Sequence, residues 1–291
     1  MNKTILVTGA NGQLGNAVRA SVSGRRDCIF HFTDVDTLDL CDAVQLSAFV
    51  EANRVSHILN CAAYTAVDRA EDDAEACMRI NRDAVQCLGM IAGARGIRVI
   101  HLSTDYVFDG RSVRPYREDD ATNPQSVYGA SKLAGEEALL AACPDAVIIR
   151  TAWLYSEYGK NFFRTMLRLG SERRTVDVVS DQIGTPTYAG DLAGAMLAIV
   201  DSPAFVPGIY HYSNEGACSW YDFAAAIMKR AGLDCLVMPV ATCEYPTRAV
   251  RPAYSVLCKD KIRQTYGMEI PGWEAGLEKA VRRIQSPNCE P

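Results

Sequence analysis

The 291-residue chain lacks the features that mark membrane, secreted and nucleic-acid-binding proteins. No apolar run reaches the roughly 18 residues that a membrane-spanning helix needs, and the first residues do not form a signal peptide with a cleavage site. The formal net charge is −5, so the excess of basic residues that binds nucleic acid is missing. We therefore expect a cytoplasmic protein that binds neither a membrane nor nucleic acid.

Paired cysteines and clustered histidines are also missing. The eleven cysteines include no C-x-x-C pair, and each of the four histidines lies in or beside an apolar run. A scattered, odd-numbered set is typical of reduced, buried thiols rather than of disulfides or a metal site. We expect no metal. With 48% hydrophobic residues the chain can bury a sizeable core, and only Ser286–Pro291 should fray.

A glycine-rich turn stands between a strand-like and a helix-like segment near the N-terminus. The apolar run Lys3–Thr8 leads directly into the turn, and Asn16–Val22 follows it. The spacing is G-x-x-G-x-x-G, which departs from the usual dinucleotide fingerprint, but strand and helix lie where that fingerprint requires them. Such a turn brings backbone N–H groups and a helix N-terminus to a pyrophosphate; the alternative is a turn without a ligand. The candidate contacts are Gly9, Gly12, Gln13, Leu14 and Gly15.

An acidic residue follows the second strand-like run, Cys28–Thr33. Asp34 lies at about the distance past the glycines at which a carboxylate binds an adenosine ribose. Asp34 and Asp36 would repel a ribose phosphate, and no basic residue follows before Arg54, so NADH is favoured over NADPH. Asp39 and Leu40 could reach the adenine, or Asp39 could cap a helix over residues 42–52.

Apolar runs then alternate with helical patterns as far as Thr151. The segments are Ser56–Cys61, Ala74–Ala94, Val99–Leu102, Ser126–Ala142 and Ala146–Thr151. This alternation predicts an α/β fold with a Rossmann-like, doubly wound parallel sheet. We expect residues 1–151, with returning segments near 180–200 and 209–213, to form the NAD(P)-binding domain. The rest of 152–291 should form a smaller C-terminal substrate-binding lobe.

Ligands of such sheets bind at the carboxyl ends of the strands, where two predicted strand ends carry unusual residues. The run 60–65 supplies small residues, including Ala62 and Ala63 before Tyr64, that would let a flat cofactor approach the backbone. The run Ser103-Thr104-Asp105 supplies hydroxyls that would lie beside a reacting carbonyl, or is a simple polar strand exit.

Tyr128 and Lys132 are spaced four residues apart, which places them on one face of a helix. A lysine charge beside a tyrosine favours the phenolate, so we expect Lys132 to lower the phenol pKa from its usual value of about 10. Tyr128 would then act as a general acid toward a carbonyl. The alternative is a solvated stripe on a helix surface.

Several motifs together resemble the extended short-chain dehydrogenase/reductases and, within them, the dTDP-4-dehydrorhamnose reductase family. They are residues 8–15, 60–71, 103–110, 128–132, 150–155, 181–187 and 251–255, so the resemblance covers nearly the whole chain. It implies NADH- or NADPH-dependent reduction of the 4-keto group of dTDP-4-dehydro-L-rhamnose. It further implies catalysis by Tyr128, Lys132 and Thr104, cofactor contacts from Ala62, Ala63, Tyr64 and Ser103, and substrate contacts from Thr104, Asp105, Trp153, Asn161 and Arg251.

Two other functions and the assembly stay open. A reductase of another nucleotide-linked keto-sugar would share the cofactor and catalytic residues, and a non-catalytic regulatory subunit of methionine adenosyltransferase resembles the same family. Some family members are described as dimers held by glutamates around magnesium, but Ala17 and Gly190 stand at the aligned positions here. We expect a monomer or a homodimer.

Overall fold

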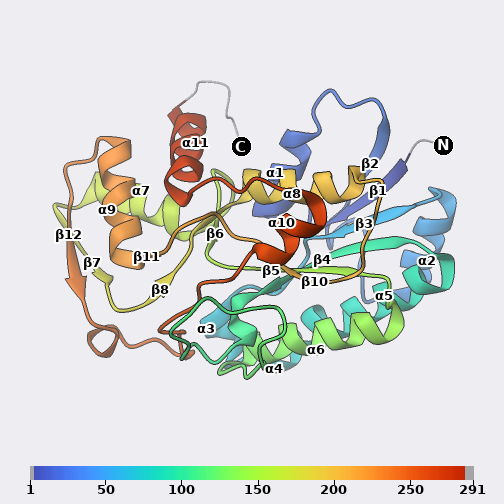
Figure 1. Ribbon diagram of the computed structural model, residues 1–291, viewed down its shortest axis with the longest axis horizontal. Helices are drawn as coiled ribbons and strands as arrows, with labels where there is room; N and C mark the ends of the chain where they lie inside the picture. Colours follow the sequence, from blue (N-terminus) through green and yellow to red (C-terminus); the bar gives the residue numbers. More distant parts are fainter. Residues whose placement is uncertain (1–2, 286–291) are drawn as a thin grey trace.

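The fold is built on one six-stranded parallel sheet, seen in a computed structural model that describes residues 3–285 (Figure 1). The strand order is β10-β5-β4-β3-β1-β2, and every neighbouring pair is parallel. The expected fraying of 286–291 concerns residues outside the described range. The strands are β1 (Lys3–Thr8), β2 (Cys28–Phe32), β3 (His57–Asn60), β4 (Arg98–Thr104), β5 (Val147–Thr151) and β10 (Gly208–His211).

Helices cover both faces of this sheet because its central strands are apolar on both sides. Alternate residues of β1 divide the core: Ile5 and Val7 pack with α1 and α8, while Leu6 packs with α2, α5 and α6. Figure 1 shows these two helical layers above and below the strands. The predicted fold class is therefore confirmed. The helices are α1 (Gln13–Ser21), α2 (Ala43–Ala52), α5 (Ala84–Arg95), α6 (Val127–Ala142), α8 (Ala189–Asp201) and α10 (Asp260–Tyr266).

The helix expected over Ala74–Ala94 is interrupted by a π-helical segment, η1 (Arg79–Asp83), between α4 (Ala74–Met78) and α5. In this wider helical turn the Asn81 side chain points toward α6, where Asn81 Nδ2 donates to the Ser131 hydroxyl at 2.9 Å. The backbone approaches α6 as well, since a Cβ at Gly135 would lie only 2.0 Å from the Asn81 carbonyl oxygen. Tertiary packing at this helix crossing therefore overrides the regular helical pattern of the sequence.

A smaller lobe has its own core, on the left of Figure 1. Phe163, Phe223 and Leu277, all fully buried, come from three different helices. A capping box between Ser219 and Asp222 begins one of these helices. The remaining elements are α3 (Val67–Ala70), η2 (Asp105–Val107), β6 (Leu154–Tyr155), α7 (Phe162–Glu172), β7 (Thr175–Val179), β8 (Ile183–Gly184), β9 (Thr187–Tyr188), β11 (Cys218–Ser219), α9 (Trp220–Ala231), β12 (Leu236–Val240), η3 (Thr242–Glu244) and α11 (Trp273–Gln285).

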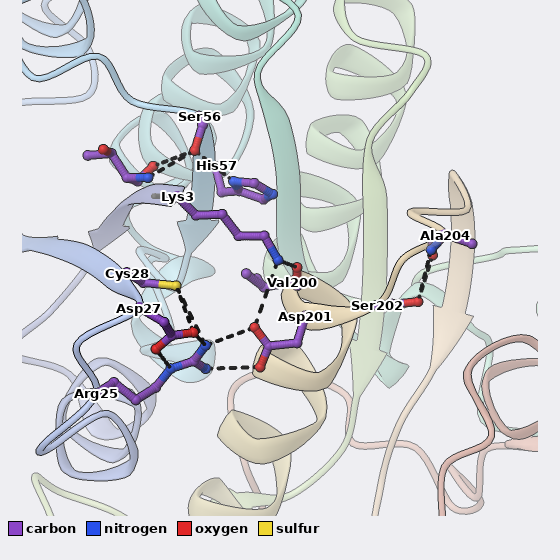
Figure 2. Close-up of polar contacts among 11 residues, drawn as sticks. Lys3, Arg25, Asp27, Cys28, Ser56, His57, Val200, Asp201, Ser202 and Ala204 are labelled. Atoms are coloured by element: carbon purple, nitrogen blue, oxygen red, sulfur yellow. Dashed lines mark hydrogen bonds and ion pairs between the residues drawn. The ribbon is translucent and has the colours of Figure 1, made fainter. Parts of the chain in front are cut away.

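An ionic cluster ties the amino end of the sheet to the last turn of α8 (Figure 2). Arg25 donates to Asp27 at 2.6 Å and to Asp201 at 2.9 Å, and Lys3 donates to the Val200 carbonyl at 2.6 Å. Within residues 3–285, Asp27, Cys28 and Asp201 form the one group whose ligand atoms lie close enough for a metal ion. The Arg25 guanidinium already binds both carboxylates, so the cluster works as an ion-pair clamp.

No helix within residues 3–285 combines the length and the apolar character that crossing a membrane requires. Every cysteine in this part of the chain is a free thiol.

Candidate active site

The glycine turn packs so tightly that no side chain fits at Gly9 or Gly15. Gly9 has φ +61°, and a Cβ there would lie 2.7 Å from the Ala62 backbone at the end of β3. A Cβ at Gly15 would lie 2.5 Å from the Gly9 carbonyl oxygen. Gly12 precedes α1, which has no side-chain cap, so the first N–H groups of that helix are open to an anion. This arrangement is a cradle that fits a pyrophosphate.

Asp34 lies beside this turn, where its Oδ2 atom accepts a hydrogen bond from Asn11 N at 2.9 Å. The suggestion that Asp39 caps the next helix is wrong, because Asp42 accepts from the N–H groups at the start of α2. Asp39 instead lies 3.6 Å from the guanidinium of Arg79. The π-helical segment thus brings a basic side chain close to the segment after Asp34, which has no basic residue of its own before Arg54.

A cleft of about 610 Å³ runs from the glycine turn to the smaller lobe. It brings together many of the sequence-predicted residues: Gly12, Gln13, Leu14, Ala63, Ser103, Thr104, Asp105, Tyr128, Lys132, Trp153, Asn161 and Arg251. Gly9, Gly15, Asp34, Asp39, Leu40, Ala62 and Tyr64 do not line it. Sequence reasoning missed other lining residues, among them Tyr106, Lys160, Phe162 and Trp220.

Tyr128 is placed at the start of α6, whose N-cap is Ser126. Its side chain is 9% exposed, and the Tyr106 ring packs edge-on against it at 5.6 Å between centroids. Burial raises the pKa of Tyr128 above its usual range, and the hydrogen bond with the Thr104 side chain opposes that shift. The expected lowering of this pKa is therefore wrong for the protein without ligands, in which the phenol stays protonated at neutral pH.

Lys132 lies one turn further along α6 and is 1% exposed. Its ammonium donates to the Leu102 carbonyl of β4 at 2.6 Å and lies 3.4 Å from His101 Nε2. Burial lowers the pKa of Lys132 to about 8, although the Glu136 carboxylate opposes this. The Lys132 ammonium thus contacts the sheet, and burial outweighs charge in setting the pKa of Tyr128.

Ser103 and Thr104 at the end of β4 have different partners. The Ser103 hydroxyl donates to Glu136, so its proton is engaged there, although Ser103 lines the cleft beside Tyr128 as expected. Thr104 Oγ1 donates to Asp105 at 3.0 Å and accepts from Tyr106 N at 3.2 Å. Burial raises the pKa of Asp105 to about 6. Thr104 and Asp105 both remain in the cleft wall.

Glu136 and Arg150 form a buried ion pair behind the cleft. Arg150 binds Glu136 through two nitrogens, with Nη2 to Oε2 at 2.7 Å and Nε to Oε1 at 3.0 Å. The two side chains are 2% and 3% exposed, and the guanidinium lies 5.1 Å from the Phe108 ring centroid. This pair joins α6 to β5, and with Ser103 it holds both elements against β4.

Aromatic side chains form the opposite wall of the cleft. The indoles of Trp153 and Trp220 stack at 3.5 Å and 9°, and Phe162 packs against Trp220. Trp153 adopts φ +47°, unusual for a bulky residue, and a Cβ at Gly184 would lie 2.5 Å from its ring. This pair presents flat apolar surface to a ligand.

Two predicted substrate contacts already have partners. Arg251 pairs with Asp68 and donates to Tyr106 Oη at 3.0 Å, at the junction with a second cavity of about 560 Å³. Asn161 caps α7 by accepting from Arg164 N and donates to the Ser156 and Tyr158 carbonyls. Arg251 borders both cavities, whereas both ends of the Asn161 amide are engaged in the loop.

A glycine cradle at the carboxyl edge of a parallel sheet, with a buried tyrosine and lysine one helical turn apart beside it, defines an oxidoreductase of the extended short-chain dehydrogenase/reductase class. Solved structures confirm the fold at low identity as well: UDP-glucose 4-epimerase of Thermus thermophilus superposes with a TM-score of 0.81 at 20% identity, over 98% of this chain and 99% of that chain. Residues 2–286 match the RmlD substrate binding domain family, to which the chain therefore belongs.

Relatives of nearly equal length support this membership. The dTDP-4-dehydrorhamnose reductase of Sinorhizobium fredii is 41% identical, over 95% of this chain and 96% of its own. The dTDP-4-keto-6-deoxy-D-glucose reductase of Streptomyces niveus is also 41% identical, over 94% and 95%. The crystal structure of dTDP-4-dehydrorhamnose reductase from Bacillus anthracis in complex with NADP has a TM-score of 0.93 at 36% identity, covering 98% of this chain and 100% of that one.

Proposed function

We propose that the protein is a dTDP-4-dehydrorhamnose reductase, which converts dTDP-4-dehydro-L-rhamnose to dTDP-L-rhamnose. The observation that carries this proposal is the cleft in which Thr104, Tyr128 and Lys132 meet between the glycine cradle and the aromatic wall. The full-length similarity to named reductases of this substrate supports it. A nicotinamide cofactor, when bound, supplies the hydride for the keto carbon.

The residues of the chain supply the proton and hold the reacting oxygen. Tyr128, kept protonated by its raised pKa, donates its phenolic proton to the keto oxygen as that oxygen gains charge. Thr104 interacts with Tyr128, and its hydroxyl would turn from Asp105 to donate to the same oxygen. Lys132, with a pKa of about 8, is mostly charged at pH 7 and stabilises the phenolate left behind.

We propose that the sugar lies against the stacked pair of Trp153 and Trp220, with the nucleotide extending into the second cavity. Arg251 lies at the junction of the two cavities, where a diphosphate linking sugar and nucleoside would pass. A phosphate there would compete with Asp68 for the guanidinium. The aromatic stack supplies the apolar surface on which one face of a sugar ring packs.

The cradle fits either cofactor, and we keep NADH as the favoured one. Asp34 lies beside the glycine turn, where its carboxylate would accept hydrogen bonds from two ribose hydroxyls. Arg79, next to Asp39, offers a cation to a ribose phosphate and so admits NADPH as an alternative. The oligomeric state, monomer or homodimer, stays a prediction.

Reduction of another nucleotide-linked keto-sugar is the second candidate function. The Streptomyces niveus reductase, named for a different keto-sugar, is as similar in identity as the Sinorhizobium fredii enzyme. A regulatory subunit of methionine adenosyltransferase would not need a complete Thr104, Tyr128 and Lys132 arrangement in an open cleft.

Oxidation of NADH and of NADPH, followed by absorbance, tests the proposal with both keto-sugars named above. We expect turnover of dTDP-4-dehydro-L-rhamnose to fall at least about 100-fold in Tyr128→Phe, because the proton donor is lost. The matched control, Tyr254→Phe, removes a phenol that lines neither cavity and should keep full activity. Turnover of dTDP-4-keto-6-deoxy-D-glucose alone would make that sugar the proposed substrate. Turnover of neither sugar would refute the proposal that the protein is a reductase.

A further inference from the structure

A loop from the smaller lobe lies directly against the glycine turn. The Ser156 hydroxyl is 3.3 Å from Gln13 Oε1, across an interval of 143 residues in the sequence. A Cβ at Gly159, which has φ +65°, would lie 3.5 Å from Gln13 Cγ. Residues 156–161 therefore form one side of the cradle in which a dinucleotide pyrophosphate would lie.

Hydrogen bonds within this loop fix its shape. Tyr158 N donates to Ser156 Oγ at 3.0 Å, and the Asn161 amide donates to the carbonyls of Ser156 and Tyr158 at 2.9 and 3.0 Å. Asn161 also caps α7, so the loop is anchored to a helix at its far end. The backbone of this loop is consequently held beside the glycine turn.

Lys160 is the side chain that the loop presents to the cleft. It lines the same cavity as Gly12, Gln13 and Leu14, and its ammonium makes no hydrogen bond or ion pair with the residues of 3–285. The other two cations of the cleft wall have partners: Lys132 binds the Leu102 carbonyl, and Arg251 binds Asp68. Lys160 is therefore the cation of this wall that is available to an anion.

We propose that Lys160 binds the pyrophosphate of the dinucleotide cofactor, so that the smaller lobe contributes directly to cofactor binding. This rests on the proposed function only in requiring a dinucleotide in the glycine cradle. A helix N-terminus supplies roughly half an elementary charge, far less than the two negative charges of a pyrophosphate, so an added ammonium is favourable there. Arg251, at the junction with the second cavity, is better placed for the substrate diphosphate.

Calorimetric titration with NADH, ADP-ribose and dTDP tests the proposal without turnover. Lys160→Met should weaken NADH and ADP-ribose about tenfold and leave dTDP unchanged, because only the first two carry the cofactor pyrophosphate. Lys160→Arg should restore most of the affinity, since the charge is kept. The matched control is Lys229→Met, which removes an exposed lysine of α9 that does not line the cleft.

Salt separates a charge contact from a change of loop shape. The loss in Lys160→Met should shrink at high ionic strength, because a solvent-exposed charge pair is screened. A loss independent of salt, an unchanged NADH affinity, or a loss confined to dTDP would each overturn the assignment. A wild-type protein that binds neither NADH nor NADPH would overturn the proposed function as well, which distinguishes the two failures.

Discussion

Replacing Lys132 by methionine should stabilise the protein without its ligands while it removes activity. Lys132 is 1% exposed, and burial lowers the pKa of its ammonium from 10.5 to about 8. In the unfolded chain the lysine keeps its ordinary pKa, so folding disfavours the charged form. Methionine retains most of the aliphatic stem and carries no charge, and the buried volume stays nearly filled.

The size of this stabilisation and its pH dependence both follow from the difference in the pKa of Lys132 between the folded and unfolded states. Below pH 8 the lysine is protonated in both states, and the folded state bears the whole cost, about 3 kcal/mol. As the pH rises from about 8 to 10.5, the folded protein releases the proton first, and the cost disappears. The variant loses the hydrogen bond to the Leu102 carbonyl, which costs about 1 kcal/mol. The net gain in the free energy of unfolding is therefore about 2 kcal/mol at pH 7.

Thermal unfolding of wild type and Lys132→Met, measured from pH 7 to pH 10.5, is the assay. At pH 7 the variant should unfold about 5 °C higher, and the gap should close as the pH rises. Lys229→Met, an exposed control, should match the wild type throughout. A variant less stable than wild type at pH 7, or a gap that does not change with pH, would refute the reasoning.

Three further predictions concern other parts of the site. Arg150→Met leaves the buried Glu136 carboxylate without its cation and should lower the free energy of unfolding, measured in urea, by about 3–5 kcal/mol. Adding Glu136→Gln to this variant should recover part of that stability. An equal loss in the double variant would contradict the ion-pair account. Trp220→Ala removes half of the aromatic stack and should raise the KM for the sugar nucleotide about fivefold, while the KM for NADH stays constant. Asp34→Ala should weaken NADH about tenfold and NADPH less, and equal losses would remove its role at the ribose.

The sheet and the cradle could be predicted from sequence because their rules are local. Each buried parallel strand is a short apolar run, and the tight contacts at Gly9 and Gly15 admit no side chain. Parallel topology also brings the carboxyl ends of neighbouring strands to one edge, which is why Thr104 lies in the same cleft as the glycine turn. The roles of these residues stay predictions.

Contacts between distant segments could not be predicted in this way. Trp153 lies between β5 and β6 whereas Trp220 begins α9, and nothing in either local sequence shows that their rings stack. The approach of Arg79 to Asp39 depends on the π-helical segment, which follows from packing against α6. The pKa of Tyr128 does not follow from sequence, because spacing along a helix shows proximity to Lys132 but does not show burial.

The edge strand β10 limits where the chain can be cut to make fragments or chimeras. It pairs with β5, and α8, which precedes it, covers the sheet together with α1. A fragment that ends at Thr151 would leave β5 as an open edge and uncover the apolar side chains under α8, two conditions that promote aggregation. The segment up to Thr151 therefore cannot be exchanged between relatives as one uninterrupted piece, and a chimera must keep α8 and β10 with their own sheet.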